Sequence, residues 1–211
     1  MPVSKSAIIA IAVLLFSAIY PLLAGNKDLP ASDTFFRKLE TVKSQSCDFS
    51  QEQRISGLKR PISLNGRFHM DNKGNLAWIV KNPVRFFCII YNGKLTSWDG
   101  ETDTKKTIDI NDHPAFSTMI EMMKKFFAGK ISVEKDYRSR ILSAEKIILE
   151  PLKHTMLAGN VSEIEITLAP DRRSIKVIRI LSANGDRSTM YFRNTVLDAP
   201  VPASVWKNGV E

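Results

Sequence analysis

Residues 47–83 read CDFSQEQRISGLKRPISLNGRFHMDNKGNLAWIVKNP, and two apolar segments in this stretch alternate in the manner of β-strands. From Ile62 to Met70, apolar or small residues occupy every second position. The predicted apolar face holds Ile62, Leu64, Gly66, Phe68 and Met70, and the predicted solvated face holds Ser63, Asn65, Arg67 and His69. A turn at residues 71–74 (DNKG) leads into a second alternating segment at residues 76–80. Antiparallel strands with one large apolar face need another part of the chain to cover that face.

The first 24 residues have the pattern of a secretory signal peptide. Lys5 precedes an apolar run over residues 7–16, and Pro21 and Ala24 follow it. An uncleaved membrane anchor is the alternative, but Pro21 and the shortness of the run argue against it. We therefore expect residues 1–24 to be removed and residues 25–211 to form a single exported domain.

The chain is basic, with a formal net charge of +8. An excess of positive charge favours binding to nucleic acid, to an anionic membrane surface or to an acidic partner. The Lys and Arg residues are scattered along the predicted strands, with no run longer than two, and therefore indicate the solvated face of a sheet. The export signal argues against nucleic acid as a partner.

Turn signals divide most of the chain into short strands. Asn92-Gly93 and Asn184-Gly185 each separate two apolar segments, and Asn-Gly is a strong hairpin signal. We expect a helix over residues 31–45 and an extended tail over residues 198–206. Predicted strands cover residues 47–55, 62–70, 76–80, 86–91, 95–99, 105–110, 131–133, 143–150, 161–168, 175–181 and 186–194. About ten strands in up-and-down order predict a mainly β fold, either an open, incomplete barrel or one strongly curved antiparallel sheet.

A longer helix interrupts the strands at residues 114–127, with Gly129 as its predicted C-cap. It is rich in Met and Phe at spacings of three and four residues. It could be an ordinary core helix in which Met fills gaps. Its position between two sets of strands favours a lid over the apolar face of the sheet.

No motif indicates an enzyme, a metal site or a cofactor. The three histidines are far apart in the sequence, and none has a Cys, Asp or Glu at metal-ligand spacing. There is no P-loop, no G-x-G-x-x-G and no G-x-S-x-G. Cys47 and Cys88 could form a disulfide in an oxidising compartment or remain two buried thiols, and the sequence does not decide between them.

A curved sheet closed by a helix forms a concave apolar cavity that suits one hydrophobic ligand. An acyl chain gains about 0.8 kcal/mol for each buried CH₂ group, and Met side chains adapt to flexible chains. The residues expected to line the cavity are Phe49, Phe68, Met70, Trp78 and Val80 on the sheet and Phe116, Met119, Ile120 and Met123 on the lid.

Several short motifs occur in a recognisable order: Phe49-Ser50-Gln51, residues 64–68 (LNGRF), residues 76–78 (LAW), Asn82-Pro83 and residues 91–94 (YNGK). Together they resemble the periplasmic outer-membrane lipoprotein carrier (LolA) family. The resemblance is clearest over residues 49–99. It implies an incomplete antiparallel barrel with helices as a lid, whose apolar interior takes the acyl chains of lipoproteins between the two membranes.

The sequence departs from this pattern at residues 72–74 (NKG), where the family has an Arg-Pro whose Arg holds the lid. It therefore resembles a divergent LolA-like branch. The related receptor LolB needs a lipidated Cys, and position 26 is Asn. The resemblance implies a periplasmic monomer that carries an acylated lipoprotein or another amphipathic lipid from an inner-membrane exporter to an outer-membrane acceptor. The alternative is a periplasmic protein-interaction module with a filled core and a basic docking face.

Overall fold

The computed structural model describes residues 34–112, 124–125, 127–130, 133–155 and 157–209. Its main element is an eleven-stranded antiparallel sheet. The strands are β1 (Ser44–Arg54), β2 (Ile62–Asp71), β3 (Leu76–Asn82), β4 (Phe86–Tyr91), β5 (Lys94–Asp99), β6 (Thr104–Asp109), β7 (Tyr137–Ile141), β8 (Lys146–Pro151), β9 (Val161–Leu168), β10 (Ile175–Ser182) and β11 (Arg187–Leu197). The short helical elements are η1 (Leu39–Thr41), η2 (Ile110–Asp112), α4 (Val133–Asp136) and α5 (Ala203–Asn208). None of the helices in the described part of the chain has the length and apolar character needed to span a bilayer.

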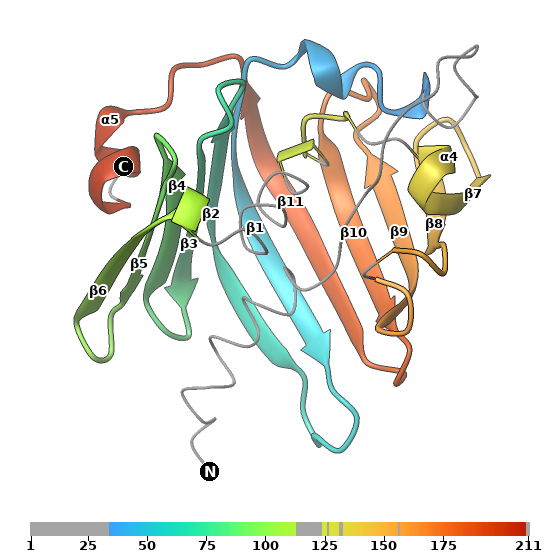
Figure 1. Cartoon of the computed structure of the whole chain (residues 1–211), viewed down its shortest axis with the longest axis horizontal. Coiled ribbons are helices and arrows are strands. Elements are labelled where there is room, and N and C mark those ends of the chain that lie inside the picture. The colour runs from blue at the N-terminus through green and yellow to red at the C-terminus, as the bar shows by residue number, and fades with distance from the viewer. Residues whose placement is uncertain (1–33, 113–123, 126, 131–132, 156, 210–211) are drawn as a thin grey trace.

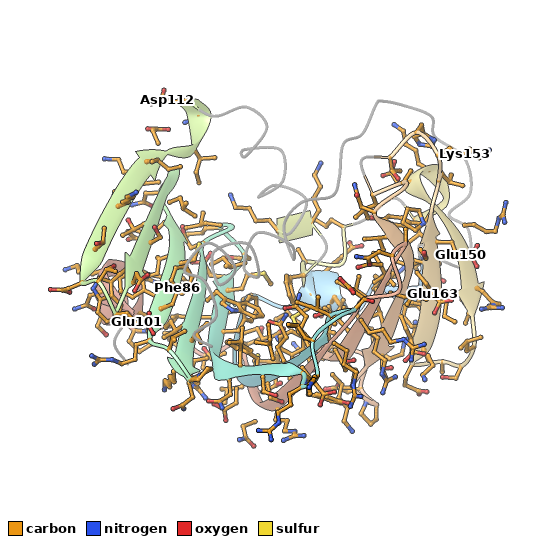
Figure 2. All side chains as sticks on the ribbon, turned by 90° about the horizontal axis from the view of Figure 1, so that it is seen from below. Phe86, Glu101, Asp112, Glu150, Lys153 and Glu163 are labelled. Carbon is orange, nitrogen blue, oxygen red and sulfur yellow. The ribbon has the colours of Figure 1, made fainter. Side chains whose placement is uncertain are left out.

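The strand order is β6-β5-β4-β3-β2-β1-β11-β10-β9-β8-β7. Two up-and-down halves are thus joined by the pairing of β1 with β11, and β6 and β7 form the two edges (Figure 1). The sheet bends into a U, as Figure 2 shows, with Asp112 near one rim and Lys153 near the other. The predicted curved antiparallel sheet is confirmed. It is an incomplete barrel because β6 and β7 do not pair.

Side chains on alternate positions form two separate apolar clusters, one on each face of the sheet. On β3, Leu76, Trp78 and Val80 belong to the larger cluster, whereas Ala77 and Ile79 belong to the smaller one. We call the face with the larger cluster the concave face, and the opposite one the outer face. The concave cluster also contains residues of every strand from β1 to β11 except β6, together with Phe35, Phe36 and Leu39 from the segment before β1.

The C-terminal tail (residues 198–209) covers part of the outer face. Val205 of α5 is completely buried against Ala77, Ile79, Phe87 and Ile89, and α5 contacts β3 and β4 (Figure 1). This tail ends in a helix that closes with Gly209 in the left-handed conformation. The extended tail predicted over residues 198–206 is therefore wrong for residues 203–206, although Val205 does fill an apolar site.

Three other expectations are corrected. In the described part of the helix predicted over residues 31–45, only residues 34–35 and the 3-10 turn η1 are helical, and strand begins where Ser44 pairs with Asp71 of β2. Val133 begins the short helix α4 and not a strand, and β7, which the sequence analysis omitted, follows at Tyr137.

The Asn92-Gly93 hairpin is confirmed, with positive φ angles of 49° and 75°.

Candidate ligand-binding face

Five predicted lining residues come together on the concave face, at its centre. Phe49 lies on β1, Phe68 and Met70 lie on β2, and Trp78 and Val80 lie on β3. All five are buried and belong to the same apolar cluster. Their proximity follows from strand register, because Cys47, Phe68 and Trp78 are paired across β1, β2 and β3, as are Phe49, Gly66 and Val80.

Aromatic rings form the middle of this cluster. Phe68 is at its centre, with ring centroids 4.6 Å from Phe127, 5.6 Å from Trp78 and 6.1 Å from Phe192. Phe49 lies 4.1 Å from Trp78. Such offset and edge-to-face contacts stabilise a cluster beyond the effect of apolar burial alone.

The four predicted lid residues, Phe116, Met119, Ile120 and Met123, lie outside the described residues. The end of that helical segment is described. The Ala128 amide donates to the Lys124 carbonyl at 2.9 Å, and the Lys130 amide donates to the Lys125 carbonyl at 2.8 Å. Gly129 has a φ of +71°, which confirms it as the residue that ends the helix.

This segment packs on the concave face. Phe127, which the sequence analysis did not include in the site, contacts the rings of Phe68 and Phe192. A Cβ on Gly129 would lie 2.7 Å from the Phe36 carbonyl oxygen, so only glycine allows this close approach to the segment before β1. A Cβ on Gly74 would lie 3.1 Å from the Lys124 side chain, which places that side chain beside the turn between β2 and β3.

The second half of the chain also contributes to the concave face, and the site prediction omitted it. The buried residues there include Ile147, Leu149, Ile164, Ile166, Leu168, Ile178, Met190 and Phe192. The alternation over residues 161–168 was recognised as a strand, but the sequence alone did not reveal which face joined the cluster. The β1–β11 pairing supplies that information, because it places Phe192 opposite Phe49.

An arginine anchors the segment before β1 to the opposite half of the sheet. Arg172, in the turn between β9 and β10, donates a hydrogen bond to the Phe35 carbonyl at 2.9 Å. Its guanidinium carbon also lies 5.4 Å from the centroid of the Phe35 ring. Both contacts hold Phe35 and Phe36 over the concave face.

Glutamines interrupt the apolar row of β1. Gln45, Gln51 and Gln53 share the concave side with Cys47 and Phe49, and all three are buried. The Gln45 amide nitrogen lies 3.6 Å from the Cys47 sulfur, and the Gln51 amide nitrogen donates to the Ser188 hydroxyl at 3.1 Å. The sequence analysis quoted Gln51 as part of a motif without assigning it a place in the site.

The prediction that His69 faces water is wrong. His69 is 1% exposed on the outer face, and its Nδ1 lies 2.8 Å from the Ser46 hydroxyl. Its register partner on β3 is Ala77, which is buried beneath the C-terminal tail. Alternation within β2 correctly assigned the face of this residue, but a second layer covers that face.

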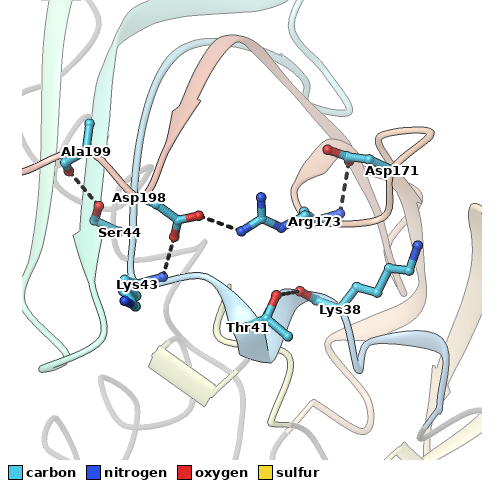
Figure 3. Close-up of polar contacts among 8 residues, drawn as sticks. All are labelled: Lys38, Thr41, Lys43, Ser44, Asp171, Arg173, Asp198 and Ala199. Carbon is cyan, nitrogen blue, oxygen red and sulfur yellow. Dashed lines mark hydrogen bonds and ion pairs between the residues drawn. The ribbon is translucent and has the colours of Figure 1, made fainter.

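A carboxylate fixes the start of the C-terminal tail. Asp198 accepts hydrogen bonds from the Lys43 amide at 2.8 Å and from the Arg173 guanidinium at 2.5 Å, and the Ser44 hydroxyl donates to the Ala199 carbonyl at 2.6 Å (Figure 3). The Lys43 amide first, and then Arg173, lower the pKa of the Asp198 carboxyl. The tail is thus tied to the junction before β1 and to the β9–β10 turn.

Both cysteines are free thiols. Cys47 and Cys88 lie in one cross-strand row, separated by Phe68 on β2 and Trp78 on β3. Three strand spacings amount to about 14 Å, far more than a disulfide spans. Burial raises the pKa of Cys47 to about 11 and that of Cys88 to about 12. Among the described residues, no group of three or more His, Cys, Asp or Glu side chains could hold a metal ion.

Several solved structures are similar to this chain at low sequence identity. An uncharacterized conserved protein from Thermus thermophilus is 7% identical, with a TM-score of 0.55 over 85% of this chain and 94% of that chain. A putative outer membrane lipoprotein-sorting protein domain from Vibrio parahaemolyticus is 8% identical, with a TM-score of 0.44 over 83% and 94%. A chain of the Pseudomonas aeruginosa MucA/MucB complex is 10% identical, with a TM-score of 0.49 over 84% of this chain and 60% of that chain. These similarities concern the fold alone.

A search of curated proteins found no match. A family model does match, and it covers most of the chain: the model of the outer membrane lipoprotein carrier protein LolA matches residues 40–208. The matched range extends from η1 to the last residue of α5 and therefore includes all eleven strands. The chain belongs to the LolA family of outer membrane lipoprotein carrier proteins.

Proposed function

We propose that this protein is a periplasmic carrier that binds the acyl chains of a lipoprotein, or of another amphipathic lipid, against the concave face of its sheet. The observation that carries the proposal is the extent of that face, because ten of the eleven strands contribute side chains to one apolar cluster. The family model that matches this chain is that of a lipoprotein carrier protein, and this membership supports a role in binding and not in catalysis.

The energetics suit an acyl cargo. Each CH₂ group removed from water contributes about 0.8 kcal/mol, so about a dozen groups gain on the order of 10 kcal/mol. This free energy is comparable with the free energy that the same acyl chain gains in a bilayer. A carrier must match the bilayer value without greatly exceeding it. Met70 and Met190 on the sheet, with Met119 and Met123 on the proposed lid, are unbranched side chains that adapt to flexible chains.

Transport requires further partners. We infer that residues 1–24 direct export and that residues 25–211 form the carrier domain, which receives cargo from an inner-membrane exporter and delivers it to an outer-membrane acceptor as a monomer. Removal of residues 1–24 takes away only Lys5 and leaves a net charge of +7, which would favour docking to an acidic partner or to anionic headgroups.

One observation favours a second candidate, a periplasmic protein-interaction module. The ring of Trp78 contacts those of Phe49 and Phe68, and Phe127 and Phe192 extend the same cluster. Rings packed in this way fill space that an acyl chain would need. In this case the concave face is a structural core and the charged surface is the functional part.

Lipid binding distinguishes the two candidates. The protein is expressed with its own N-terminal segment in a Gram-negative host, purified from the periplasm without detergent and examined by native mass spectrometry. A fluorescent fatty acid is then titrated into the delipidated protein. A carrier shows co-purifying lipid and saturable binding, whereas a filled core shows neither, and that result would leave only the interaction module.

A matched pair of variants tests the lid. Met119→Asp places a charge on the proposed apolar side of the lid and is expected to weaken fatty-acid binding at least tenfold. Leu58→Asp changes an exposed side chain in the β1–β2 turn and is expected to leave binding unchanged. Equal binding by the Met119→Asp variant and the wild type would remove residues 116–123 from the site.

A further inference from the structure

Gln51 and Gln53, two residues apart on the concave face, carry side-chain oxygens that have no hydrogen-bond partner among the described residues. Gln51 is 2% exposed and Gln53 is 7% exposed, and the Oε1 atom of each is buried without a partner in the part of the chain that the structure describes. Buried amide oxygens are nearly always hydrogen-bonded in folded proteins. Two exceptions that are two residues apart on one strand call for an explanation.

Apart from Ser188, the register neighbours of this pair are apolar. Gln51 pairs with Leu64 of β2 and with Met190 of β11, and both neighbours belong to the concave cluster. Gln53 pairs with Ile62 and Ser188. Ile62 and Ile180, the latter opposite Ser188 on β10, pack against the same cluster. Apolar side chains at positions 51 and 53 would suit these neighbours better if packing were the only requirement.

The contact with Ser188 shows which end of the Gln51 amide is already hydrogen-bonded. The Gln51 amide nitrogen donates to the Ser188 hydroxyl at 3.1 Å, which engages the donor end of the amide and leaves its acceptor end available. Residues two apart on a strand point to the same side, so both Oε1 atoms are presented on the concave side. Each can accept a hydrogen bond from an O–H or N–H group.

We propose that Gln51 and Gln53 form a polar subsite that binds a hydrogen-bond donor carried by the acyl cargo. This proposal rests on the proposed function and narrows its substrate class to chains that bear a hydroxyl or an amide N–H. A hydroxylated acyl chain and an amide-linked acyl chain share this chemistry. An ester-linked or unmodified chain can only accept hydrogen bonds, so it leaves both glutamine oxygens unsatisfied.

The test uses two pairs of probes of equal chain length, with displacement of a fluorescent fatty acid as the readout. N-methylmyristamide is compared with methyl myristate, which lacks the N–H. 3-Hydroxymyristate is compared with myristate, which lacks the hydroxyl. For each pair, the ratio of the two dissociation constants is measured in the wild type and in the Gln51→Met/Gln53→Met variant, so that differences in probe hydration cancel.

We expect the preference for the donor-bearing probe to fall about three- to tenfold in the double variant for at least one pair. The pair that responds identifies the source of the donor. Gln45→Met is the matched control, since Gln45 is equally buried on the same face of β1 but places its amide nitrogen against Cys47. It should retain the wild-type ratios.

Two results would overturn the proposal. Unchanged ratios for both pairs, with normal binding of all four probes, would show that the glutamines do not select cargo, while the carrier function would stand. Failure of the wild type to bind any probe would overturn the carrier function and the subsite together. Thermal unfolding of each variant provides a folding check, and a double variant that has lost its cooperative transition is replaced by the single variant Gln53→Met.

Discussion

The ring of Phe49 lies 4.1 Å from that of Trp78, although their strands are not neighbours in the sheet. The strand between them, β2, has Gly66 at the position opposite Phe49. Because Gly66 has no side chain, the two rings can meet across β2. The register between β2 and β3 also shifts at this point, and a Cβ on Gly66 would lie 1.8 Å from the Ile79 carbonyl oxygen.

Gly66→Ala is therefore expected to destabilise the protein by about 3 kcal/mol, at the upper end of overpacking effects, because the added methyl group meets backbone. Urea unfolding followed by tryptophan fluorescence measures the loss. Gly93→Ala is the matched control. Gly93 has a φ of +75° with nothing near its missing Cβ, so alanine there costs only the left-handed backbone penalty of about 1 kcal/mol. Equal losses in the two variants would refute the close approach at Gly66.

The C-terminal tail should contribute measurably to stability through a single residue. Val205→Ala removes two methylene equivalents from a completely buried side chain and is expected to lower the free energy of unfolding by about 2 kcal/mol. Val196→Ala makes the same chemical change at a position that is 51% exposed, and it should be close to neutral. If both variants unfold at the wild-type urea concentration, α5 does not pack on the outer face as described.

Asp198 should make stability depend on pH in the acid range. Its pKa is lowered in the folded protein, so the ionised form contributes stability above the unfolded-state pKa of about 4. That contribution is lost as the pH falls through the lower, folded-state pKa. Asp198→Asn is therefore expected to unfold more easily than the wild type at pH 6, with the difference shrinking towards pH 2.

The partner of Asp198 can be checked with a double-mutant cycle at pH 6. Arg173→Met removes the guanidinium that bonds to Asp198, and the effects of Arg173→Met and Asp198→Asn should be less than additive when combined. Full additivity in chemical denaturation would mean that the ion pair contributes nothing.

The two thiols should resist alkylation in the folded protein. Burial raises the pKa of Cys47 to about 11 and that of Cys88 to about 12, so very little of either thiol is ionised at pH 8, and the thiolate is the reactive form. Iodoacetamide at pH 8 is expected to label neither residue without denaturant and both in 8 M urea, as measured by intact mass. Protection that persists in urea unless a reductant is added would instead indicate a disulfide.

Most of the strands could be predicted from the sequence, because alternating apolar and polar residues indicate a sheet with one apolar face. The sheet centre was found through Phe68 and Trp78, whose spacing along the chain anticipated their burial. The burial of His69 could not be found in this way. It depends on residues 198–209, which lie on the outer face and are distant in sequence.

The limits of the site prediction have a similar origin. Phe192 joins Phe68 only because β1 pairs with β11, and pairing between the ends of a chain leaves no local signal. Strand β7 (YRSRI) was omitted because its inward row holds Ser139 between Tyr137 and Ile141, which leaves too few apolar residues to mark alternation. The helix predicted over residues 31–45 is interrupted by a turn at residues 36–38 and ends with η1 at Thr41, although the apolar spacing continues to Val42, two residues before strand pairing begins.

The pairing of β1 with β11 sets the order in which this molecule can assemble. These two strands occupy the middle of the sheet, yet about 130 residues separate the end of one from the start of the other. A nascent chain cannot join its two halves until nearly its whole length is accessible, so premature folding is discouraged by topology itself. Such a delay would suit the export that we propose, in which the polypeptide is threaded in extended form through a translocation pore before it folds.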